Sequence, residues 1–121
     1  MAIYKLIDKA TTTSSIPTTT SLQAPQYAIG PFYQGAGGIN VTPVQQTFQL
    51  NVSGTGSVAA TAQPVVSNDG VNWANYGSAI SANGTTSATA IANGTQQWPY
   101  YSAYMTTLTG TGAKATLMVN V

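Results

Sequence analysis

The chain has 121 residues, a net charge of +1 and charged side chains at only 4% of its positions, where an ordinary soluble domain has about a quarter. Its charged residues are three lysines and two aspartates, and it contains no His, Cys, Glu or Arg. Because most groups that transfer protons, attack carbonyls or bind metals are missing, we expect no catalytic residues, no cofactor and no metal site.

The scarcity of charge also limits the classes of partner that the chain can bind. Phosphate recognition needs several Lys or Arg on one face, so we expect no nucleic-acid binding. No apolar run reaches the roughly 20 residues that span a bilayer, and residues 1–10 lack the apolar centre of a signal peptide, so we expect no membrane association. Small proteins usually stay dispersed through mixed surface charge. A chain without it is expected to be covered by copies of itself or by a large partner.

Residues 1–40 are expected to form an extended N-terminal arm. Within them, residues 10–38 are rich in Thr and Ser and contain three prolines and three glycines near their end, a composition that disfavours helices. Several side chains in this stretch are too apolar for a solvated linker. We interpret them as anchors that bind a partner or the chain's own domain: Tyr27, Ile29, Phe32 and Tyr33.

Residues 41–121 are expected to form a β-sandwich domain. Apolar and polar residues alternate over 48–52 and again over 58–66, and Gly54-Thr55-Gly56 separates the two runs, which predicts a hairpin. Asp69-Gly70 predicts a second tight turn, because the left-handed backbone of such turns suits glycine. Calcium prefers six to eight oxygens and usually several carboxylates, so we interpret the lone Asp69 as turn chemistry.

The remainder of the chain continues this pattern. Asn83-Gly84 and Asn93-Gly94 predict turns, and a second Gly-Thr-Gly at 110–112 precedes an alternating strand that runs to Val121. We interpret the two Gly-Thr-Gly segments as one turn chemistry used twice. Turns about every 10–15 residues without helical periodicity predict an all-β fold, an antiparallel β-sandwich of jelly-roll or immunoglobulin-like order.

The aromatic residues allow two interpretations. Trp98, Tyr100 and Tyr101 lie close together in the sequence and could form a platform on which sugars stack. Alternatively, the tryptophans fill the core, which we favour because a short domain generally needs any Trp for burial. On this interpretation Trp73 is a core residue.

Three segments resemble a known family. They are Val-Val-Ser-Asn-Asp-Gly-Val-Asn-Trp at 65–73, Trp-Pro-Tyr-Tyr at 98–101 and Leu-Thr-Gly-Thr-Gly-Ala-Lys-Ala-Thr at 108–116. This arrangement is similar to that of small β-sandwich structural proteins of tailed bacteriophage virions. In that family a Ser-Asn-Asp-Gly-x-x-Trp hairpin follows a strand, and a late Gly-Thr-Gly turn introduces the last one. The resemblance covers roughly residues 44–121 and not the arm.

The resemblance implies a non-enzymatic virion component. It would be a capsid decoration, or cement, protein on the capsid exterior that binds the major capsid protein and stabilises neighbouring capsomers. A homo-oligomer is expected, with a trimer favoured. Two alternatives stay open: a head- or tail-fibre module that binds host glycans through Trp98, Tyr100 and Tyr101, and a small adhesin or pilus-type subunit. A glycan binder should expose these aromatic residues, whereas a cement protein should bury them.

Overall fold

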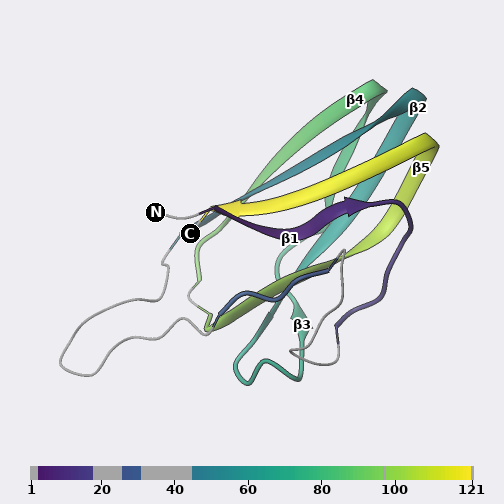
Figure 1. Cartoon of the computed structure of the whole chain (residues 1–121). Coiled ribbons are helices and arrows are strands. Elements are labelled where there is room, and N and C mark those ends of the chain that lie inside the picture. Colours follow the sequence, from purple (N-terminus) through teal and green to yellow (C-terminus); the bar gives the residue numbers. More distant parts are fainter. Residues whose placement is uncertain (1–2, 18–25, 31–44, 97, 121) are drawn as a thin grey trace.

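The computed structural model describes residues 3–17, 26–30, 45–96 and 98–120, and these contain strands and no helix (Figure 1). The strands are β1 (Ile3–Ala10), β2 (Gln46–Ser67), β3 (Ala74–Asn75), β4 (Ile80–Gly94) and β5 (Tyr100–Asn120). All pairings are antiparallel, in the order β1-β5-β2-β3 with β4 also paired to β2. The all-β prediction is confirmed. The pairings do not show the finer jelly-roll or immunoglobulin-like sandwich, because they join the strands into a single open sheet.

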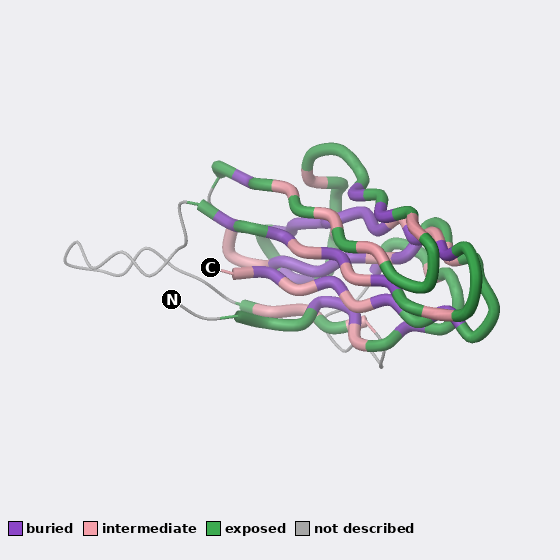
Figure 2. Tube along the Cα trace, turned by 90° about the horizontal axis from the view of Figure 1, so that it is seen from above, coloured by how far each residue is buried: buried purple, intermediate pink, exposed green. Residues whose placement is uncertain are grey.

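The sheet bends back on itself, because β2, β4 and β5 each turn sharply near their middle (Figure 1). The turns lie next to one another, since Thr55 of β2 is opposite Thr111 of β5 and Ser57 of β2 is opposite Thr85 of β4. The register of the pairing shifts at these positions. In Figure 2 the bends form an exposed end of the molecule, beyond strands in which buried and less buried residues alternate.

The prediction of a hairpin at Gly54-Thr55-Gly56 is wrong. The two arms of a hairpin pair with each other, whereas here the segments before and after the turn both pair with β4 and β5. The segments on either side of Gly110-Thr111-Gly112 likewise both pair with β2. Each turn uses a glycine with positive φ, 73° at Gly56 and 63° at Gly112, a conformation that glycine adopts without strain. The same turn chemistry is therefore used twice, to bend a sheet.

The core lies between the two halves of the bent sheet. In β2 the alternation predicted from the sequence is observed: every second residue from Phe48 to Val52 and from Val58 to Ala62 is buried. A single apolar cluster contains residues from before and after the bends, so the two halves pack together. Its members on the three bent strands are Phe48, Leu50, Val52, Val58, Ala60, Ala62, Val66, Ile80, Ala82, Tyr101, Ala103, Met105, Ala115, Leu117 and Val119.

Part of the range expected to be an arm is a strand of the sheet. β1 pairs with the second half of β5, where Ile3 is opposite Asn120 and Ala10 is opposite Ala115. Register shifts on either side of Ile7 interrupt the strand, and such irregularities re-aim side chains. Leu6 and Ile7 are consequently both buried although they are consecutive. This break in the period of two explains why the sequence pattern does not indicate the strand.

Residues 26–30 close one side of the bent sheet. The Tyr27 N–H donates to the Leu6 carbonyl at 2.8 Å, and Ile29 exchanges backbone hydrogen bonds with Tyr101 at 2.9 and 3.0 Å. The segment therefore joins β1, which pairs with the second half of β5, to the first half of β5. Ser14 adds another backbone hydrogen bond to the first half of β5: its N–H donates to the Met105 carbonyl at 2.8 Å.

The bend in β5 gives a test of this fold. A Cβ at Gly110 would lie 2.9 Å from Val58 Cγ1 and 3.1 Å from the Ser57 carbonyl oxygen, at a φ of +124°. Gly110→Ala should therefore lower the free energy of unfolding by about 2–4 kcal/mol, the sum of backbone strain and overpacking. The control is Gly56→Ala, where φ is +73° and nothing lies within 4 Å, with an expected loss of about 1–2 kcal/mol. Urea denaturation measures both, and equal losses would contradict the close contact at the bend.

Candidate functional site: the open edge of the sheet

Strand β4 forms an exposed edge. Within the described residues it pairs with β2 alone, so its other side presents backbone N–H and C=O groups along a strand of 15 residues. Natural proteins usually protect such edges with charged residues, proline or very short strands. β4 has none of these, since its sequence is Ile-Ser-Ala-Asn-Gly-Thr-Thr-Ser-Ala-Thr-Ala-Ile-Ala-Asn-Gly. An unprotected edge is suited to pairing with a strand of another chain.

A pocket of about 400 Å³ lies beside this edge. Both halves of β4 contribute to it, residues 80–81 from the first and 90–93 from the second. The core is therefore accessible from this side, and Ala88, Ala90 and Ala92 are only half-buried. The other lining residues come from β2 and from the segment that precedes β4: Phe48, Pro64, Tyr76, Gly77, Ser78 and Ala79.

Tyr76 fixes one wall of the pocket. Its ring lies edge-on to Phe48, with centroids 6.2 Å apart, and it is tilted against Tyr101 at 6.3 Å. Its hydroxyl donates to Gln46 Oε1 at 2.8 Å and accepts from the Gln96 N–H at 3.0 Å. Because Gln46 is buried, this network connects the pocket wall to the start of β2. The sequence pattern gives no sign of this role for Tyr76.

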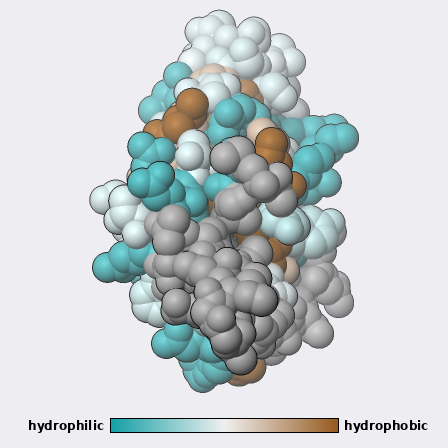
Figure 3. All heavy atoms as spheres, turned by 90° about the vertical axis from the view of Figure 1, so that its left-hand side faces the viewer, coloured by the Kyte–Doolittle hydropathy of each residue, from teal (hydrophilic) through white to brown (hydrophobic). Residues whose placement is uncertain are grey.

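Ile91 is the most exposed large apolar side chain of this edge, at 64%. It lies in the second half of β4 and lines the pocket. On the face drawn in Figure 3, the hydrophobic residues outside the grey region lie in small groups separated by hydrophilic ones. The β4 edge is distinguished by its unpaired backbone and by the pocket beside it.

Two of the four proposed arm anchors, Tyr27 and Ile29, lie among the described residues and contact β1 and β5, away from β4 in the order of strands. Ile29 is half-buried and bridges to Tyr101, so the chain's own sheet holds its backbone. Tyr27 has an exposed side chain, at 39%, while its carbonyl accepts from the Ser102 hydroxyl at 2.9 Å. Phe32 and Tyr33 lie outside the described residues.

The aromatic residues proposed as a sugar platform have unequal exposure. Tyr101 is fully buried and offers no face to a ligand, whereas Trp98 and Tyr100 are half-buried. Trp73, expected in the core, is half-buried and lies edge-on to Tyr100 with ring centroids 6.5 Å apart. It precedes the two-residue strand β3 at an edge of the sheet, and it is outside the core cluster.

The turn at Asp69 is confirmed as turn chemistry. Asp69 Oδ1 accepts from the backbone N–H groups of Asn72 at 2.8 Å and Val71 at 2.9 Å and from the Ser67 hydroxyl at 2.8 Å. The Asn72 side chain donates to Oδ2 at 2.8 Å. These hydrogen bonds, led by that of the Asn72 backbone, hold the pKa of Asp69 well below its ordinary value. The carboxylate thus organises its own loop, in which Gly70 has a φ of 75°.

Other kinds of site find no support in the described part of the chain. It contains no group of three or more His, Cys, Asp or Glu side chains placed to hold a metal ion. None of its segments is a helix long and apolar enough to cross a membrane. Comparison with protein-family models, with curated proteins and with solved structures finds no match to the chain. Function is therefore inferred from the arrangement of the residues themselves.

The Tyr76 network predicts an effect on stability. Tyr76→Phe should lower the free energy of unfolding by about 1–2 kcal/mol, because it removes a hydroxyl that bonds a buried side chain. Tyr104→Phe is the matched control, since the Tyr104 hydroxyl makes an exposed hydrogen bond of 3.1 Å to Asn75 Oδ1; its loss should be under about 0.5 kcal/mol. Urea denaturation monitored by tryptophan fluorescence compares the two. Similar losses in both variants would contradict a structural role for the Tyr76 hydroxyl.

The titrating groups predict a broad pH range of stability. The lowered pKa of Asp69 contributes stability that is complete above its unfolded pKa, about 4, and that decreases as the pH falls below it. Burial raises the pKa of Tyr101 to about 12 from 10.0, which contributes stability that is complete below pH 10 and is lost as the pH rises toward 12. The urea midpoint should therefore change little between about pH 5 and 9.

The control for this profile is Asp69→Asn, which should flatten its acid side. Tyr101 remains in that variant, so the loss of stability at alkaline pH should persist. A marked fall of the urea midpoint between pH 6 and 8 in the unaltered chain would show that other groups dominate the titration.

Proposed function

We propose that this chain is a non-enzymatic structural protein of a tailed-phage virion. It acts as a capsid decoration, or cement, protein on the capsid exterior, where it binds the major capsid protein and stabilises neighbouring capsomers. The observation that carries this proposal is the unprotected edge of β4 with the pocket beside it. In this role the two halves of the bent sheet act as the two layers of a small β-sandwich.

The edge supports a function in assembly. Its backbone groups can extend the sheet by pairing with a strand of another chain, a mode of recognition that gains affinity from main-chain hydrogen bonds. The pocket can receive an apolar side chain from the same partner, against Phe48 and Tyr76. A cement protein needs many such contacts acting together, because their combined avidity exceeds that of any one.

The proposal includes self-association. A β4 edge that contacts a different surface of a neighbouring copy makes a head-to-tail interface, which closes into a ring if the rotation allows. A trimer is the ring expected here. The exposed side chain of Tyr27 is then available to the capsid surface. Salt should weaken these contacts little, because screening acts on charged groups and β4 contains none.

The glycan-binding alternative has less support. A stacking platform needs exposed aromatic faces, and Tyr101 has no exposed surface. Trp98 packs partly against the core cluster. A fibre module would have to use Tyr100 with little help from its neighbours.

Ile91→Lys tests the proposed edge. A lysine on an edge strand opposes strand addition, so the variant should shift the oligomer toward monomer and reduce binding to capsids. Its matched control is Val71→Lys, which places the same charge at another exposed aliphatic position, 48% exposed, in the Asp69 turn. Light scattering after size-exclusion chromatography measures the mass, and co-sedimentation with undecorated capsids measures binding. A monomeric unaltered chain, or equal effects of the two variants, would overturn the role of the edge.

A further inference from the structure

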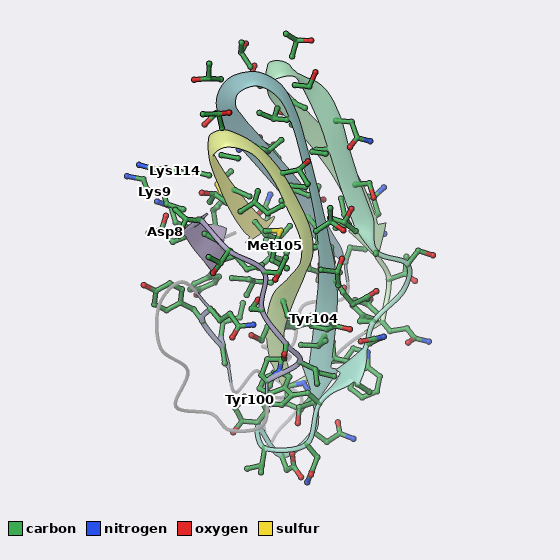
Figure 4. All side chains as sticks on the ribbon, turned by 90° about the vertical axis from the view of Figure 1, so that its right-hand side faces the viewer. Asp8, Lys9, Tyr100, Tyr104, Met105 and Lys114 are labelled. Carbon is green, nitrogen blue, oxygen red and sulfur yellow. The ribbon has the colours of Figure 1, made fainter. Side chains whose placement is uncertain are left out.

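A second pocket, of about 370 Å³, gathers most of the cationic charge of the chain. Lys9 of β1 and Lys114 of β5 both line it, and the third lysine, Lys5, does not. In Figure 4 the two side chains lie next to each other and point the same way, away from the sheet. The remaining lining residues are Asn51, Val52, Ser53, Ser87, Ala88, Thr89 and Thr116, so the pocket contains no carboxylate.

The nearest acidic residue in the sequence is engaged elsewhere. Asp8 directly precedes Lys9, but its Oδ1 lies 3.5 Å from Lys5 Nζ, and Asp8 does not line the pocket. Placing two ammonium groups at one pocket without a carboxylate costs electrostatic energy, since like charges repel. In a chain with three cations in total, this concentration favours a negatively charged ligand.

The polar side chains of the pocket also have donors to spare. Asn51 uses its carbonyl oxygen twice, to accept from Thr89 Oγ1 at 2.8 Å and from Gln49 Nε2 at 3.2 Å. Its amide NH₂ has two further donors, and no partner for them lies among the described residues. Thr116 Oγ1 accepts from the Lys9 N–H at 3.1 Å, so its hydroxyl hydrogen is available to an acceptor. These donors, together with the two lysines, suit an oxyanion.

The backbone of β1 is distorted where it supplies Lys9. Lys9 has a φ of 54°, which is uncommon for a residue with a side chain. The distortion falls in the register shift between Ile7 and Ala10, and the hydrogen bond to Thr116 holds it. Strain of this kind, about 1–3 kcal/mol, places Lys9 at the same pocket as Lys114.

We propose that this pocket binds an acidic sugar. The carboxylate or sulfate of the sugar lies between the Lys9 and Lys114 ammonium groups, with charge-assisted hydrogen bonds. Its hydroxyl groups accept from Asn51 Nδ2 and the Thr116 hydroxyl. The volume is within the range of small-ligand pockets, about 300–1,000 Å³. The pocket borders β4 through residues 87–89, but its lysines lie on β1 and β5. The proposal does not depend on the proposed virion function.

The experiment is titration calorimetry on the full chain with oligogalacturonate, a carboxylate sugar, and with neutral oligogalactose of the same length. The acidic oligosaccharide should bind and the neutral one should not. Lys114→Gln should weaken binding by about fivefold, the loss expected for one exposed ion pair. Lys5→Gln is the control for net charge: it removes the same charge outside the pocket and should weaken binding less than Lys114→Gln does. Asn51→Ala should also weaken binding, although it removes no charge.

Three results would overturn the proposal. Equal effects of Lys114→Gln and Lys5→Gln would show that net charge, and not the pocket, attracts the ligand. Equal affinity for hexa-aspartate or inorganic sulfate would show that the site recognises negative charge without the sugar. Absence of binding by oligogalacturonate and by a sulfated oligosaccharide such as a heparin fragment would remove the ligand class altogether. Circular dichroism of each variant confirms that the compared proteins are folded.

Discussion

The fold depends on β2, β4 and β5 bending back at neighbouring positions of the sheet. Where β2 and β5 bend, a Cβ at Gly54 would lie 3.0 Å from Val58 Cγ1 and 3.1 Å from Ala113 Cα, so glycine permits the close approach of the two halves. The bends must also stay in step, because β2 pairs with β4 and β5 on both sides of the turn. A sheet folded in this way buries one face of each half and needs no helix to cover it.

A sheet that bends back on itself has two open sides between its halves. In this chain one side is closed and the other is not. Residues 26–30 connect β1 to the first half of β5 and close one side with backbone hydrogen bonds. On the other side, β4 has small half-buried alanines, an unpaired edge and a pocket that reaches Phe48. The open side is thus the place where another chain can complete the structure, and this asymmetry underlies the proposed role in assembly.

Local patterns predict the strands of this fold but not its connections. The alternation around Leu50 and Leu117 and the turn at Asp69 follow from the sequence, because each depends on neighbouring residues. Gly54-Thr55-Gly56 has the same local sequence whether its flanking strands pair together or with others, and only distant partners decide. β1 escapes prediction because its irregular register breaks the period. The edge position of β4 and the proximity of Lys9 to Lys114 are likewise consequences of topology.

Scarcity of charge makes the remaining charges informative. Lys9 and Lys114 come from strands near the two ends of the chain, yet they line one pocket, whereas the whole of β4 is uncharged. Screening at physiological ionic strength acts over about 8 Å, so it weakens the attraction of an anion to the lysines and leaves backbone pairing at β4 largely intact. The two proposed contacts therefore differ in their sensitivity to salt. The proposed assembly surface and the proposed ligand pocket therefore differ in the type of interaction, although both include residues of β4.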